Sequence, residues 1–275
     1  MRDLRAFRAF YRKHKLQAID GWMNFCVYLT EMNQIKWHIG CSGFHYKDWK
    51  GIFYPDDIPQ RKWFEYYSSK FDTLELNVTF YRFPQLKFLQ NWYSISPAGF
   101  SFAVKVPRLI THYKQLNSCE ELLDDFYSTA ELGLKDKLGA VLFQFPAQYQ
   151  YSDERLERLL TQLRKGFNNA VEFRHDSWWT DKVYNELKKE EIVFCGISHP
   201  RLPDKALVTN ETAYYRFHGI PKLYYSSYEQ DGLRKVADSI KKDKIIKKVF
   251  IYFNNTATIA AIENATWLKE YCKNT

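Results

Sequence analysis

Charged and amide side chains stand near the ends of six apolar segments of this chain, at positions from which they could act on one ligand. They comprise two acids, three permanent bases, one imidazole and three amides, namely Glu75, Glu172, Lys105, Arg174, Arg216, His218, Asn77, Gln144 and Asn254. Carboxylates and imidazoles transfer protons, whereas guanidinium and ammonium groups bind phosphate or carboxylate oxygens. Together these residue types indicate acid/base chemistry on an anionic ligand.

The nine residues divide into groups by what their side chains can do. The predicted catalytic groups are Glu75, Glu172 and His218. The predicted clamp for an oxyanion consists of Lys105, Arg174 and Arg216. The predicted neutral substrate-binding groups are Asn77, Gln144 and Asn254. We expect His218 to titrate near neutral pH without a special environment, as imidazoles do.

The elements that must position these residues are short β-strands. Apolar β-like segments alternate with helical ones along the chain, which is typical of α/β architecture with parallel strands. The expected strands are residues 37–42, 72–79, 101–106, 139–145, 170–174, 192–198, 213–218 and 248–254.

Alternation along the expected strands places the polar side chains on one side. In residues 170–174, Glu172 and Arg174 alternate with Val171 and Phe173. Burying an unpaired charge in a closed apolar core costs much free energy. Because inward polar groups recur towards the C-terminal ends of six strands, we predict a (β/α)8 TIM barrel with its site at that face. An open doubly wound sheet is the alternative, but the chain lacks its nucleotide-binding glycine loops.

Helical segments fill most of the intervals between the expected strands. Ser118 and Glu121 have the spacing of a capping box, which would begin one of these helices. Between the sixth and seventh strands, Pro200 and Pro203 leave little room for a crossover helix. We therefore expect an irregular loop or a short turn there.

The loop after the first strand is rich in aromatic residues, which are Phe44, Tyr46, Trp49, Phe53 and Tyr54. These rings could stack on a base or a sugar over the barrel mouth. They could equally pack against the protein as a lid, and we favour this second interpretation.

Composition and charge indicate a globular protein. The 275 residues are 45% hydrophobic, and a formal net charge of +8 favours anionic ligands such as a small molecule or nucleic acid. The five cysteines are odd in number and contain no Cys-x-x-Cys pair, so we expect reduced thiols in a cytoplasmic protein. No segment from residue 32 onwards has the length and apolarity of a membrane span.

The first 31 residues stand apart from this pattern. We interpret residues 1–31 as an N-terminal extension that is either disordered or upstream of a natural start at Met32. Residues 32–275 are expected to form a single barrel domain. The sequence makes no prediction of the oligomeric state.

The strand ends also carry an ordered series of motifs. It includes Glu75-Leu-Asn-Val-Thr-Phe-Tyr-Arg82, Phe143-Gln-Phe-Pro146, Val171-Glu-Phe-Arg-His175, Arg216-Phe-His-Gly219 and Tyr252-Phe-Asn-Asn255. From about residue 37 to the C-terminus the chain resembles the YecE-like family, the domain of unknown function number 72. The resemblance implies a (β/α)8 barrel but no settled reaction. Members often carry an Asp after the sixth strand, where this chain has Ser198-His199-Pro200.

Three functions fit these residues. The leading hypothesis is an enzyme that acts on a phosphate-bearing or other anionic substrate at the C-terminal face of the barrel, by hydrolysis. The alternative is a non-catalytic module that binds nucleic acid or a phosphorylated ligand through its positive mouth. Sugar isomerase or hydrolase chemistry is the third, and the excess of positive charge disfavours it.

Two further interpretations concern the charges themselves. Glu75 and Glu172 could pair with the three bases as an internal salt-bridge lattice that only plugs the barrel; such networks seldom improve on apolar packing, so we favour function. With His218 the two acids could instead bind a divalent metal, but neighbouring Lys and Arg would repel the cation. No cofactor and no metal is therefore predicted.

Overall fold

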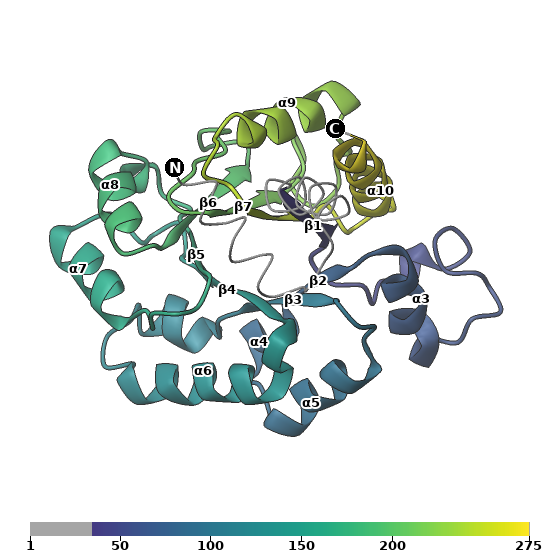
Figure 1. Cartoon of the computed structure of the whole chain (residues 1–275), viewed down its shortest axis with the longest axis horizontal. Helices are drawn as coiled ribbons and strands as arrows, with labels where there is room; N and C mark the ends of the chain where they lie inside the picture. The colour runs from purple at the N-terminus through teal and green to yellow at the C-terminus, as the bar shows by residue number, and fades with distance from the viewer. Residues whose placement is uncertain (1–34, 275) are drawn as a thin grey trace, which may run out of the picture. The chain divides into compact units, whose positions relative to one another are not determined.

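The computed structural model describes residues 35–274. Eight strands form a nearly closed parallel barrel with helices outside it (Figure 1), which confirms the predicted (β/α)8 architecture. The strands are β1 (Lys36–Cys41), β2 (Thr73–Leu76), β3 (Ser101–Lys105), β4 (Leu138–Gln144), β5 (Asn169–Glu172), β6 (Val193–Ser198), β7 (Thr212–Phe217) and β8 (Lys248–Phe253).

Helices occupy every interval between the strands except one. They are α3 (Trp63–Lys70), α4 (Val78–Tyr81), α5 (Leu86–Ile95), α6 (Glu120–Leu134), α7 (Asp153–Gln162), α8 (Asp181–Lys189), α9 (Gln230–Lys241) and, after β8, α10 (Ala260–Lys273). The exception is the interval between β6 and β7, which is an irregular loop, as its prolines predict. A five-residue π-helix, η3 (Leu109–Tyr113), lies between β3 and α6.

Two local predictions were wrong. The second strand ends at Leu76 instead of continuing to residue 79, because Asn77 has helical dihedral angles and α4 follows it. The hydroxyl of Thr79 donates to Lys105 O at 2.6 Å, so contacts to the neighbouring strand outweigh the β-propensity of this segment. The capping box is also absent, since Ser118 has a φ of +47° and Cys119 is the N-cap of α6. The predicted extension, residues 1–31, lies outside the described residues.

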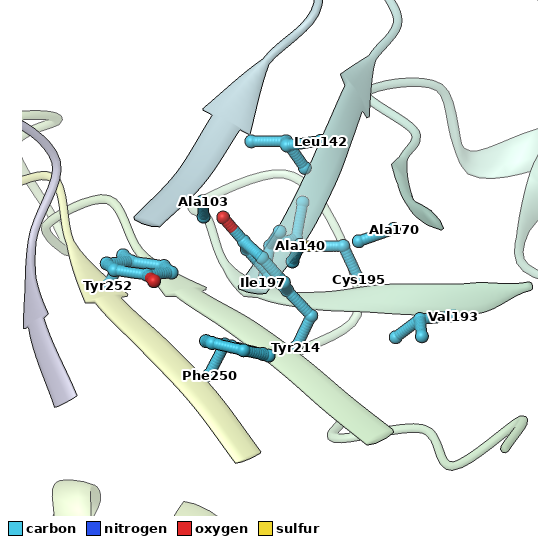
Figure 2. Packing of buried hydrophobic residues seen from close by; sticks show 10 residues of the cluster. All are labelled: Ala103, Ala140, Leu142, Ala170, Val193, Cys195, Ile197, Tyr214, Phe250 and Tyr252. Carbon is cyan, nitrogen blue, oxygen red and sulfur yellow. The ribbon is translucent and has the colours of Figure 1, made fainter. Parts of the chain in front are cut away.

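Side chains that point inward from the strands fill the barrel interior beneath the mouth. Figure 2 shows the cluster, which consists of Ala103, Ala140, Leu142, Ala170, Val193, Cys195, Ile197, Tyr214, Phe250 and Tyr252. Ala103, Leu142 and Tyr252 each stand two positions before a predicted site residue and so share its side of the strand, and all three belong to the cluster. The parity of the strands is therefore correct, and the polar residues that follow on the same side must face the mouth.

The edges of the sheet, β1 and β2, are joined by one side chain of α3. The Tyr67 hydroxyl accepts a hydrogen bond from Cys41 N at 2.8 Å and donates one to Thr73 O at 3.0 Å. The ring is fully buried, so no water can replace these bonds. A glycine is needed at position 40, because a Cβ there would lie 2.5 Å from Thr73 O.

We expect Tyr67→Phe to lower the free energy of unfolding by about 1–3 kcal/mol, because two buried backbone groups lose their partner. Tm should fall by roughly 2–4 °C per kcal/mol in a thermal melt. Tyr66→Phe is the matched control, because its hydroxyl makes no hydrogen bond to a described residue. Equal Tm values for the two variants would contradict this role of Tyr67.

Candidate functional site

A group of buried charges covers the apolar filling of the barrel. Arg216, on β7, donates through Nη1 to Glu172 Oε2 and through Nη2 to Glu75 Oε1, each at 2.6 Å. None of these three residues is more than 1% exposed. The Tyr214 hydroxyl donates to Glu75 Oε2 at 2.7 Å and so connects the charges to the core. We call Glu75, Glu172 and Arg216 the buried lattice.

Arg174 and His218 lie next to the buried lattice, on the side nearer the barrel mouth. Arg174 Nε donates to Glu172 Oε1, and Arg174 Nη2 lies 3.1 Å from His218 Nε2. The Asn254 amide nitrogen lies 3.0 Å from His218 Nδ1. On the other side, the Asn77 amide donates to Glu75 Oε1 at 3.2 Å. The lattice thus contacts three of the remaining predicted residues directly, since His218 Nε2 also lies 3.4 Å from Glu172 Oε1, and it reaches Asn254 through His218.

Electrostatics within this network keep its members in fixed protonation states. Burial alone would raise the pKa of Glu172, but Arg174 and Arg216 hold that pKa well below its ordinary value. Burial, assisted by Arg174, holds the pKa of His218 well below its ordinary value. The ring is therefore neutral at pH 7, and the expectation that His218 titrates near neutrality was wrong. Two carboxylates and two guanidinium groups leave this network with no net charge.

A cleft of about 1010 Å³ opens at the C-terminal ends of the strands, beside Arg174. The basic residues that line it are Lys105, Arg108, Arg174, Arg201 and Lys222. Its described lining contains no Asp or Glu. The positive charge that the sequence predicts is therefore concentrated in the cleft, where no carboxylate balances it. A second cleft of about 910 Å³ runs along α7, outside the barrel, and is lined by charges of both signs.

Lys105 is the last residue of β3 and reaches the cleft from the barrel interior. The residue is 9% exposed, and its Nζ lies 4.1 Å from the centroid of the Phe80 ring. Within residues 35–274, Nζ makes no ion pair and no hydrogen bond. Burial and then the charge of Arg216 lower the pKa of Lys105 to about 7. The neutral amine is therefore accessible here at neutral pH.

Two histidines line the same cleft. Burial, followed by the charge of Lys105, lowers the pKa of His112 to about 4. Burial and Arg174 also lower the pKa of His199. Both rings are neutral at pH 7, so the positive charge of the cleft comes from its lysines and arginines.

The structure divides the predicted anion clamp. Lys105 and Arg174 line the cleft, as does Gln144, whose amide donates to Phe145 O at 2.7 Å. Arg216 does not line it, because both of its terminal nitrogens are bound to carboxylates. Glu75, Glu172, His218, Asn77 and Asn254 also lie outside the lining.

Sequence reasoning missed three basic residues of the cleft, namely Arg108, Arg201 and Lys222. Each follows a strand by three to five residues and lies outside the strands. Strand parity assigns a direction only to residues within a strand, so it could not place them. Their position shortly after a predicted strand could have indicated them, since the segments that follow barrel strands form the C-terminal face.

The aromatic loop after β1 packs against the protein, as the favoured interpretation predicts. The Tyr54 ring stacks on Trp63 of α3 with centroids 4.5 Å apart, and Trp49 Nε1 donates to Thr258 O at 2.9 Å. None of its rings lines the cleft; the aromatic residues that do so are Phe80, Tyr81, Tyr113 and Tyr224.

Within residues 35–274, no group of three or more His, Cys, Asp or Glu side chains has the arrangement of a metal site. None of the helices in that range combines the length and the apolarity that crossing a membrane requires.

The model of the family described as "Protein of unknown function DUF72" matches residues 38–275. The chain belongs to the DUF72 family. This confirms the resemblance found in the strand-end motifs. The relative UPF0759 protein YunF of Bacillus subtilis (strain 168) is 26% identical over 269 residues, which cover 85% of this chain and 93% of YunF.

Solved DUF72 structures have the same barrel. The DUF72 protein of Thermotoga maritima is 28% identical, with a TM-score of 0.78 over 86% of this chain and 99% of its own. One from Enterococcus faecalis, at 20% identity, has a TM-score of 0.74 over 86% of this chain and 95% of its own and shows the fold alone. These relatives therefore agree on the architecture, and the function must be argued from the site.

We expect Arg216→Met to destabilise the fold by about 3–5 kcal/mol, because the buried Glu75 loses its ion-pair partner and Glu172 keeps only Arg174. Adding Glu75→Gln should recover part of this loss, since the uncompensated charge of Glu75 disappears. Urea denaturation measures both changes.

Arg61→Met is the control for loss of an arginine. Arg61 is exposed and forms no ion pair within residues 35–274, so its replacement should change stability by less than about 0.5 kcal/mol. A loss below about 1 kcal/mol for Arg216→Met, or no recovery when Glu75→Gln is added, would contradict the structural role of the lattice.

Proposed function

We propose that the protein binds a phosphate-bearing or other anionic small molecule in the cleft at the barrel mouth and acts on it by proton transfer. The observation that carries this proposal is the charge imbalance of the cleft, which has five basic side chains and no carboxylate in its described lining. A structural role does not account for such an excess, because like charges repel one another. The cleft also lies at the face where barrel enzymes have their sites.

The binding roles follow from the shapes of the basic groups. Arg108 and Arg201 form no ion pair with any residue in 35–274, so their planar guanidinium groups are available for bidentate contacts to an oxyanion. Arg174 keeps Nη1 free of hydrogen bonds to the described residues, although its other nitrogens hold the network. Lys222 adds a point charge, and Gln144 a neutral hydrogen-bonding group.

Lys105 is the residue that we assign to proton transfer. It lies in the cleft, and its pKa of about 7 matches the requirement for efficient acid/base catalysis at neutral pH. The sequence predicts this role for Glu75, Glu172 and His218, but their complete burial supports a positioning role, in which they hold Arg174 towards the ligand. Hydrolysis stays a prediction, with Lys105 as the group that would accept a proton from water.

Nucleic acid is the second candidate ligand, favoured by exposed tyrosines around the cleft. Tyr81 and Tyr113 are each 66% exposed, and the guanidinium of Arg108 lies 5.8 and 5.5 Å from their ring centroids. Exposed rings beside cations suit stacked bases of a single strand. Oligonucleotide binding that weakens steeply with salt, without turnover of phosphate esters, would favour this candidate; no binding at low salt would eliminate it.

Chemistry on a neutral sugar has less support. Glycoside hydrolysis uses two carboxyl groups on either side of the scissile bond. Glu75 and Glu172 are both bound to Arg216 and do not line the cleft.

We expect sulfate to bind roughly fivefold more tightly at pH 6.5 than at pH 8, as measured by isothermal titration calorimetry. Sulfate keeps its charge over this range, whereas Lys105, with its pKa lowered to about 7, is neutral above pH 7 and becomes charged below it. Lys105→Met should remove the pH dependence. Arg108→Ala should weaken binding at both pH values.

Arg61→Ala is the matched control, because Arg61 is exposed and lies outside the cleft lining. It should leave sulfate affinity unchanged at both pH values. Absence of sulfate binding at millimolar concentration, or the same loss for Arg61→Ala as for Arg108→Ala, would refute the proposed anion site.

A further inference from the structure

We propose that Lys105 forms a Schiff base with the carbonyl group of a phosphate-bearing aldehyde or ketone bound in the cleft. The phosphate part of this inference rests on the proposed function. The covalent step rests on the surroundings of the Lys105 amine, so the two parts can fail separately.

The surroundings of Lys105 disfavour its charged form. A lysine buried to this extent normally pairs with a carboxylate, but Nζ here faces the Phe80 ring and makes no ion pair within residues 35–274. Arg216 and Arg174 act against the ammonium form, and the opposing attraction of Glu75 and Glu172 does not outweigh burial. A desolvated lysine beside other cations is the setting in which a neutral amine becomes a nucleophile towards carbonyl carbon.

Groups that can move protons lie in the same cleft. The His112 ring meets the Phe80 ring edge-on, with centroids 4.9 Å apart, so both Lys105 and His112 contact the same aromatic ring. His112 Nδ1 lies 2.9 Å from the Thr111 hydroxyl, which orients the imidazole and leaves Nε2 for exchange with a ligand. His199 also lines the cleft and is neutral at pH 7. The nucleophile and the proton-transfer groups are therefore different residues.

The proposed step balances without another reactant. The Nζ lone pair attacks the carbonyl carbon, a C–N bond forms, and the carbonyl π electrons move to oxygen. His112 takes one proton from the nitrogen and passes it to this oxygen, which gives a carbinolamine. The C–O bond then breaks as the nitrogen lone pair forms the C=N bond, and the hydroxyl group leaves as water with the second proton of the nitrogen, again transferred by His112. Amine and carbonyl are thereby converted into imine and water.

The remaining cleft residues determine which carbonyl compound fits. Arg108, Arg201 and Lys222 supply positive charge away from the barrel interior, whereas Lys105 and Phe80 lie at its inner end. A small molecule with a carbonyl at one end and a phosphate at the other matches this distribution. The Phe80 ring would also shield the imine from water, which limits its hydrolysis.

The test uses pyridoxal 5′-phosphate, a phosphate-bearing aldehyde, and pyridoxal, which lacks the phosphate. The full chain is incubated with each at pH 7, imines are reduced with sodium borohydride, and modified lysines are mapped by mass spectrometry. Lys105 should react about tenfold faster than Lys222, an exposed lysine of the same cleft, because ordinary lysines are almost wholly protonated at this pH. Lys105→Met should remove the main adduct, and Lys87→Met, at an exposed lysine outside the cleft lining, should retain it.

Each part of the inference has its own contradicting result. Modification of Lys105 no faster than of Lys222, in protein that still binds sulfate, would overturn the Schiff base and leave the anion site standing. Equal modification of Lys105 by pyridoxal and pyridoxal 5′-phosphate would support the reactive amine and overturn the phosphate specificity. Preferential modification of Lys105 by the phosphorylated probe, with sulfate as a competitor, is the result expected if both hold.

Discussion

The ion pairs of Arg216 with Glu75 and Glu172 are the interaction on which the site depends. A guanidinium group and two carboxylates can be buried at the centre of a barrel only if each compensates the others. Strands β2, β5 and β7 must keep their registers to bring these three residues together. The lattice therefore couples the mouth to the packed interior below it, and Tyr214 is the hydrogen-bonded link between the two.

Neutralisation within the lattice determines the character of the cleft. Because Glu172 and Glu75 form ion pairs with Arg216 and Arg174, neither carboxylate compensates the basic groups nearer the solvent. Lys105 lies between the two layers, where burial and then the nearby cations remove much of its affinity for a proton. The same arrangement thus produces an anion-binding surface and a lysine that can be neutral at physiological pH. Both properties would be lost if a carboxylate of the lattice faced the cleft.

The sequence predicted most of the fold because strand parity is a local property that burial enforces. It correctly assigned the inward direction of Ala103 and Leu142, and it identified residues that form the lattice. It could not predict the pKa of His218, which depends on burial and on Arg174, a residue that follows β5. It missed Arg108 because tertiary contacts determine the direction of a side chain outside the strands. The predicted second strand was too long, because a tertiary contact, the hydrogen bond from the Thr79 hydroxyl to a neighbouring strand, determines the conformation of its last residues.

NMR titration of the lysine side chains tests most directly whether Lys105 joins a neutralised lattice to an anion-binding cleft. With 13C-labelled Lys Cε, one resonance should titrate with a pKa of about 7, and this resonance should be missing in Lys105→Met. Sulfate should raise the pKa of this lysine, because a bound anion favours the ammonium form. Titration of all lysines near their ordinary pKa of about 10.4, or a shifted lysine that does not respond to sulfate, would contradict it.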